Sequence, residues 1–229
     1  IWIVENGGDE DTEQAVGRAL EWLAEHQCRD GGWHFDLAEC RKCRGKCGNS
    51  EKQRNDRTAA TALALLPFLG RGISHSNSHP NDARYQRTVA EGIAFLQDRV
   101  ANDGKVDGVG ESWTMYSQGL AGIVLAEICE IVASDQLNAD ANGPKQPGNV
   151  NDEPIDEKAL LDDTKQVLRF ICRAQDPEGG GWRYQPRQPG DISVVGWQMM
   201  AIHAGKKNVP NAPGTWQNAV TFLDSVQAD

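Results

Sequence analysis

The side chains most able to do chemistry in this sequence are cysteines gathered in one polar stretch. Four of the six cysteines lie there, at Cys28, Cys40, Cys43 and Cys47. Four thiolates in one loop can close a tetrahedral zinc site, which would order a loop of about residues 28–56 that has no core of its own. Neighbouring basic side chains favour the thiolate form, and they are Arg41, Lys42, Arg44 and Lys46.

His34 offers a spare fourth ligand for such a site. Two disulfides are the competing interpretation, because they would fasten the same loop by another route, and free thiols are the third. Zinc would indicate a cytoplasmic protein, and disulfides an exported or periplasmic one. The predicted role is structural in either case, since four cysteine ligands leave no position open for water. Cys129 and Cys172 fall in apolar helical stripes and are predicted to be packing residues.

The composition of the chain is that of a globular protein and argues against several classes. The 229 residues suffice for one large domain or two small ones, and 39% of them are hydrophobic. The net charge of −10 argues against a nucleic-acid-binding protein and against docking on anionic lipid. No run of 18 apolar residues occurs, so no membrane span is expected. The first residue is Ile1 rather than Met, which predicts a processed product or a fragment of a longer polypeptide.

Helices must position these residues, because apolar side chains recur at intervals of three and four along most of the chain. Seven helices are expected, at about 12–27, 57–69, 83–99, 113–133, 157–175, 191–206 and 214–227. No stretch shows the two-residue alternation of a strand for long enough to matter, so an all-α fold is expected. The segment 134–156 is rich in Asn, Asp, Pro and Gly, and we expect a mobile loop there within a single domain of residues 1–229.

The first, third, fifth and seventh helices resemble one another, which indicates an internal repeat. The stretch "ALEWLAEHQCRDGGW" is matched by "GIAFLQDRVANDGKV", by "VLRFICRAQDPEGGGW" and by "AVTFLDSVQAD". The helices between them share an opening, Asp56-x-Thr58 in one and Asp191-x-Ser193 in another. The pattern predicts three helical hairpins and the start of a fourth.

The first copy of the repeat carries a basic and a small residue, an aromatic–aliphatic pair, Gln27, and a Gly-x-Trp that ends at Trp33. These residues fill the repeat motif of squalene–hopene cyclases, so the chain resembles the α/α-toroid superfamily of terpenoid cyclases and protein prenyltransferases. Gln175 and Trp182 fill most of the motif again, whereas the second copy has Val in both positions. The resemblance implies a toroid-like arc of helical hairpins in which these Gln and Trp side chains fasten one repeat to the next.

The superfamily's known chemistries lack their key residues in this chain. Cyclases protonate their substrate with a DxDD-type acid cluster, and the nearest match is the single Asp191, a weak catalytic candidate. An Asp two residues before Ser at a helix start is typical of an N-cap, and we interpret Asp191 and Asp56 in this way. The Asp-x-Cys zinc ligands of prenyltransferases and the Gly-Cys-Gly-Glu-Gln run of the thioester relatives are absent as well.

The second, fourth and sixth helices carry aromatic and thioether side chains that could line a concave apolar surface. The candidate pocket residues are Trp113, Met115, Tyr116, Trp197, Met200 and His203. In the cyclases such aromatic faces stabilise carbocations, whereas aromatic and Met residues at helical spacing are also ordinary core residues. His203 is open to two interpretations, a packing residue or a ligand that faces the cavity.

Three functional hypotheses follow from these patterns. The first is a non-catalytic domain that binds an apolar small molecule, such as an isoprenoid or lipid, or a protein. The second is a divergent terpene cyclase or prenyltransferase, and the third is a structural scaffold in an exported protein. Seven helices make only part of a full toroid, so we also expect a homodimer or completion by further chain. A structural zinc is the one cofactor considered.

Overall fold

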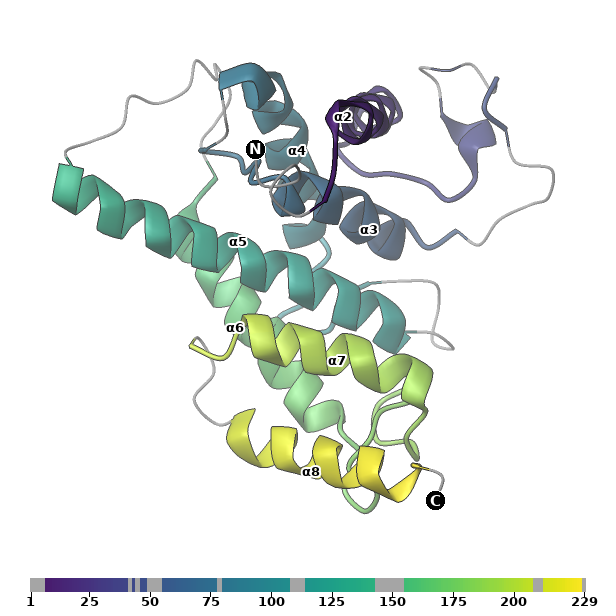
Figure 1. Cartoon of the computed structure of the whole chain (residues 1–229). Helices are drawn as coiled ribbons and strands as arrows, with labels where there is room; N and C mark the ends of the chain where they lie inside the picture. The colour runs from purple at the N-terminus through teal and green to yellow at the C-terminus, as the bar shows by residue number, and fades with distance from the viewer. Residues whose placement is uncertain are drawn as a thin grey trace.

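The computed structural model describes residues 7–40, 43, 46–48, 55–77, 80–107, 114–142, 155–207 and 212–227 (Figure 1). Within these ranges the chain forms seven α-helices and two short 3-10 helices, with no strand. The all-α fold is therefore confirmed. The α-helices are α2 (Glu10–Glu25), α3 (Arg57–Gly70), α4 (Gln86–Gln97), α5 (Thr114–Asn142), α6 (Glu157–Ala174), α7 (Ile192–Ala204) and α8 (Ala212–Ser225). The 3-10 helices are η1 (Leu37–Glu39) and η2 (Pro80–Tyr85).

Inner and outer helices alternate along the chain. The inner helices are α3, α5 and α7, and α5 contacts α3 on one side and α7 on the other, as Figure 1 shows. The outer helices contact the inner ones from the far side: α2 and α4 contact α3, α6 contacts α5 and α7, and α8 contacts α7. This alternation is the arrangement expected for a repeat of helical hairpins, each of which buries its apolar face against its neighbours.

Small residues allow the inner helices to pack closely. Every residue of α5 from Leu120 to Ala126 is buried. A Cβ atom added at Gly119 would lie 2.6 Å from the side chain of Gln198, and one added at Gly122 would lie 3.1 Å from the Cβ of Ala201. Larger residues at these two positions would force α5 and α7 apart, because packed interiors have no spare volume.

Helix α5 is the central helix of the core, and it extends beyond the end predicted from the sequence. Residues 134–142, expected in the loop 134–156, are helical, while 143–154 lie outside the described residues. The segment Thr114–Asp135 is long and apolar enough to span a membrane by length and composition alone. However, 72% of its apolar window is buried inside the protein, which is what a core helix requires.

Aspartate side chains begin most of the helices that the sequence predicts. Asp56 and Asp191 are the N-caps of the inner helices α3 and α7, and Asp156 is the N-cap of α6. Asp9 caps α2 and forms a reciprocal capping box with Thr12. Each carboxylate accepts a hydrogen bond from a backbone N–H that has no partner within its own helix. The cap interpretation of Asp56 and Asp191 is therefore confirmed.

Candidate functional site

The first junction between repeats is built around Gln27 and Trp33. The side-chain amide of Gln27 donates to the carbonyl oxygen of Gly31 at 2.9 Å and to that of Thr88, in the first turn of α4, at 2.8 Å. The indole N–H of Trp33 donates to the carbonyl oxygen of Leu23, near the end of α2, at 2.8 Å. Both side chains are buried. Gln27 therefore joins the end of one outer helix to the start of the next.

The third junction repeats these contacts atom for atom. The amide of Gln175 donates to the carbonyl oxygens of Gly180 at 2.7 Å and of Thr215, in α8, at 2.8 Å. The indole N–H of Trp182 donates to the carbonyl oxygen of Ile171 at 2.8 Å. The two Gln–Trp pairs thus have the same structural role, because their amide and indole N–H groups donate to backbone carbonyl oxygens and are not available to a substrate.

A glycine lets each junction turn lie directly on the next outer helix. Gly31 and Gly180 have φ values of 84° and 76°, which L residues with side chains rarely adopt. A Cβ atom would lie 2.2 Å from the carbonyl oxygen of Glu91 in the first case and 2.3 Å from that of Asn218 in the second. The turns therefore require glycine for their backbone conformation and for this close approach.

The second junction keeps the same turn without the Gln–Trp pair. Gly104 has a φ of 83°, and Val100 and Val106 occupy the Gln and Trp positions. Gln118, a fully buried residue of the inner helix α5, takes over the missing contacts. Its amide donates to the carbonyl oxygen of Gly104 at 2.8 Å and of Val167 at 3.4 Å, and its side-chain oxygen accepts from the N–H of Val106 at 2.8 Å. The repeat motif does not predict this role of Gln118.

Asp191 has the environment of a capping residue. It accepts from the N–H of Ser193 at 3.0 Å, from the hydroxyl of Ser193 at 2.7 Å and from the hydroxyl of Tyr184 at 3.2 Å. The two bonds from Ser193 lower the pKa of Asp191, and the Tyr184 hydroxyl lowers it further. An acid that protonates a substrate needs the opposite shift, so these contacts do not favour a catalytic role.

The six candidate pocket residues have different surroundings. Trp113 lies outside the described residues. Met115 is fully buried and therefore lines no open surface. Tyr116 and Trp197 are half-buried, and the Tyr116 hydroxyl lies 2.7 Å from that of Ser193. Met200 is 52% exposed, and the exposed His203 lies beside the Trp216 ring at a centroid distance of 6.0 Å.

His26, at the end of α2, and two cysteines of the cysteine-rich loop form a group of three side chains that could hold a metal ion, and His26 was not predicted. A ring nitrogen of His26 and the Sγ atoms of Cys40 and Cys43 lie within 4.8 Å of one another. His26 and Cys40 are buried, and Cys43 is half-buried. This group could hold a metal ion, because thiolate and imidazole are the ligands of zinc sites. Among the predicted ligands, Cys28 and Cys47 lie outside the group, as does the spare ligand His34.

None of the six cysteines forms a disulfide, and all six are free thiols in the structure. Burial raises the pKa of Cys28, and the Arg57 guanidinium beside it acts in the opposite direction. Burial also raises the pKa values of Cys129 and Cys172, as expected for packing residues in helices.

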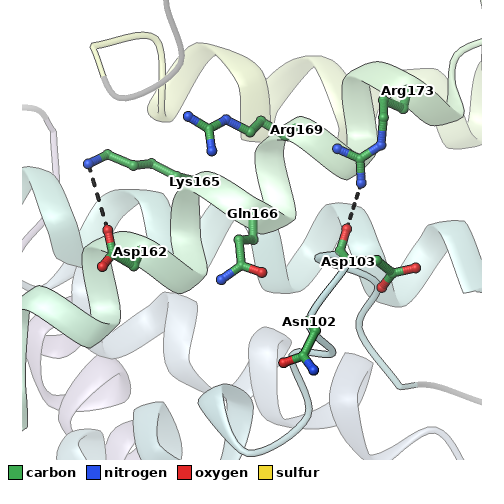
Figure 2. A pocket seen from close by; sticks show the side chains of 7 residues that line it. All are labelled: Asn102, Asp103, Asp162, Lys165, Gln166, Arg169 and Arg173. Atoms are coloured by element: carbon green, nitrogen blue, oxygen red, sulfur yellow. Dashed lines mark hydrogen bonds and ion pairs between the residues drawn. The ribbon is translucent and has the colours of Figure 1, made fainter.

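A polar groove of about 510 Å³ lies between α6 and the second junction turn (Figure 2). Lys165, Arg169 and Arg173 line it from one face of α6, and Asn102 and Asp103 line it from the turn. Arg173 donates to the carbonyl oxygen of Asp103 at 2.6 Å. This arginine therefore helps to hold the turn against α6.

In the part of the chain that the structure describes, the fold and the junctions define an all-α, repeat-like arrangement of helical hairpins. No family model matches the chain, and no curated protein matches it. The resemblance to the α/α-toroid superfamily therefore stays a prediction that rests on the repeat motif.

Proposed function

We propose that this chain is a non-catalytic repeat domain of the α/α-toroid type that binds a protein partner through the exposed side of its inner helices. One observation carries the proposal: α7, an inner helix, exposes Ile192 by 65% and Met200 by 52%. Leu63 of the inner helix α3 is 39% exposed as well. Apolar residues at two turns' separation on a helix are typical anchors of a protein interface.

The exposed stripe of α7 is separate from the side that packs in the core. Gly196 and His203 continue the stripe, since they lie about one turn from Ile192 and Met200 and are also exposed. The opposite side is buried, through Val194, Val195, Gln198, Ala201 and Ile202. A helix with apolar residues on both sides is expected to bury the second side against something else.

A protein partner fits the exposed residues better than a small apolar molecule does. Small-molecule sites are concave and enclose most of their ligand. Met115 is inside the core, whereas Met200 and His203 stand open to solvent. An isoprenoid or lipid ligand is the competing outcome of the experiment below.

The contacts of Asp191 support the non-catalytic part of the proposal. Its carboxylate is engaged by Ser193 and Tyr184, and its pKa is lowered. Incubation of the purified chain with squalene and with prenyl diphosphates, followed by product analysis, should give no turnover. Turnover that the Asp191→Asn variant abolishes would establish a terpene cyclase or prenyltransferase relative and end this proposal.

Site-directed photo-cross-linking tests the binding surface. A photoreactive amino acid is placed at Met200 and, as a control, at the exposed Arg169 of α6. We expect one protein adduct from position 200 that position 169 does not give. The purified partner should then bind the Met200→Glu variant at least about tenfold more weakly, because a charge would be buried in an apolar contact. Equal adducts at both positions, or a lipid adduct alone, would refute a protein partner.

We also propose that the cysteine-rich loop holds a structural zinc ion. Two cysteines of the loop lie together with His26 at the end of α2, and sulfur and nitrogen ligands favour zinc among the common metals. Zinc would supply stability to a loop in which η1 is the one helical turn within its described residues.

Native mass spectrometry beside the denatured mass tests the zinc proposal. We expect one zinc per chain with reduced cysteines, and a chelator should lower the melting temperature. A metal-free mass short by four protons would mean two disulfides and would replace zinc with the exported-protein interpretation.

A further inference from the structure

We infer that His26, at the end of the outer helix α2, is a metal ligand, and that it binds together with Cys40 and Cys43 through its Nε2 atom. This inference rests on the zinc proposal and changes its ligand set, since the cysteine pattern alone points to four thiolates. It assigns a residue of the repeat itself to the metal centre. The structural consequence is a metal bond between the loop and the first repeat junction.

The hydrogen bond of the other ring nitrogen fixes which atom is available. Nδ1 of His26 lies 2.6 Å from the carbonyl oxygen of Trp22. A carbonyl oxygen can only accept, so Nδ1 carries the proton and donates it. In the neutral ring, Nε2 then has a free lone pair. Metal-binding histidines are commonly held in this way, with the second ring nitrogen donating to a backbone carbonyl.

The Nε2 atom is buried and has no partner. His26 is 4% exposed, and Nε2 is inaccessible to solvent without a hydrogen bond. Leaving a buried polar atom unpaired is unfavourable, so such atoms are rare in folded proteins unless they have a function. The Trp22 ring stacks on His26 at a centroid distance of 3.9 Å and limits its rotation. The imidazole is therefore fixed in place with its lone pair unused.

The separations suit a metal after a small adjustment. Zn–S and Zn–N bonds of about 2.3 and 2.0–2.1 Å place tetrahedral ligand atoms roughly 3.5–3.8 Å apart. The three ligand atoms here lie within 4.8 Å of one another. The largest separation therefore exceeds the tetrahedral value by at most about 1.3 Å, a gap that side-chain rotation can close.

The position of His26 gives the metal a structural task. His26 is the C-cap of α2, and Gln27 beside it donates to the start of α4. A metal bound to His26 would hold the loop against this junction. Three protein ligands leave one tetrahedral position, for Cys47 of the same loop or for water.

X-ray absorption of the zinc-loaded, reduced wild-type chain tests the ligand set directly. We expect one imidazole and two or three sulfur ligands. Zinc affinity is then measured by competition with a chromogenic chelator for His26→Asn and for two control variants, His34→Asn and Cys28→Ser. His26→Asn should weaken zinc binding at least about 100-fold. Loss of a residue that only hydrogen-bonds to a metal ligand already lowers metal affinity by about 10–100-fold, and loss of a ligand should have a larger effect. The controls should change it by less than about threefold.

Each result decides between the possibilities. An all-sulfur spectrum, or zinc binding that His26→Asn leaves unchanged while Cys28→Ser abolishes it, would overturn the inference and leave structural zinc standing. A reduced wild-type chain that binds no zinc would overturn both. The spectrum of the wild-type chain decides the question even if His26→Asn fails to fold, and far-UV circular dichroism of the metal-free variants detects that failure.

Discussion

The buried amide of Gln118 should be one of the most sensitive single positions in the chain. We consider its replacement by Met, which keeps the length of the side chain and removes its polar atoms. The substitution leaves the N–H of Val106 and the carbonyl oxygen of Gly104 without their partners, at positions where the contacts measure 2.8 Å. Val106 and Gln118 are both fully buried, so water cannot replace the lost bonds.

The expected loss follows from these two groups. Each buried, unpaired backbone group costs about 1–3 kcal/mol, so Gln118→Met should lower the free energy of unfolding by about 2–6 kcal/mol. We count nothing for the 3.4 Å contact with Val167, because it is long. For a chain of this size each kcal/mol corresponds to about 2–4 °C, so the melting temperature should fall by roughly 4–24 °C.

Urea unfolding followed by circular dichroism measures the effect. The matched control is Gln217→Ala, a change in an exposed helical glutamine, which should alter stability by less than about 0.5 kcal/mol. A loss below about 1 kcal/mol for Gln118→Met would refute the argument that this amide replaces the missing Gln–Trp pair.

Three further predictions follow from the contacts described above. Gly180→Ala should lower the free energy of unfolding by at least about 1 kcal/mol more than Gly72→Ala does. Both glycines have positive φ (76° and 79°), but only Gly180 lies against a backbone oxygen. Equal losses of stability in urea unfolding would contradict the close approach. Asp191→Ala should lower stability by about 1 kcal/mol and Asp191→Asn by much less, since Asn also caps helices; equal losses by thermal melting would argue against a cap role. The Arg57 guanidinium lowers the pKa of Asp30 to about 2, so the ion pair should contribute fully above about pH 4 and lose its contribution as the pH falls towards 2. Because the Asp30 side chain is 52% exposed, Asp30→Asn should lower the free energy of unfolding by no more than about 1 kcal/mol at pH 6. The difference in stability between this variant and the wild type should shrink in unfolding measurements below about pH 4.

Helix positions were predictable because burial imposes a period on the sequence. In α6, for example, the buried residues Leu160, Thr164, Val167, Leu168 and Ile171 follow the three- and four-residue spacing. The end of α5 was not predictable in the same way. Residues 134–142 are mostly polar and resemble a loop in composition, yet they continue the helix, because polar residues tolerate a helix that is already nucleated.

The junction contacts of Gln27 and Trp33 could be expected from the motif, whereas Gln118 and His26 could not. The inner helix α5 is apolar on nearly every side, so no periodicity shows which of its residues meets the turn at Gly104. A glutamine within the apolar first half of this helix is the signal that was available. His26 belongs to the helical pattern of α2, and only the folded loop brings Cys40 and Cys43 to it.

The acceptors at the junctions have a consequence for how such a chain can change over evolutionary time. Gln27 and Gln175 reach the carbonyl oxygens of Thr88 and Thr215, and every amino acid supplies such an oxygen. Substitutions of surface side chains on the helix that accepts this hydrogen bond therefore leave the contact between the two repeats intact. A newly duplicated hairpin would be compatible with its neighbour at once, and the copies could diverge in the residues they present to a partner.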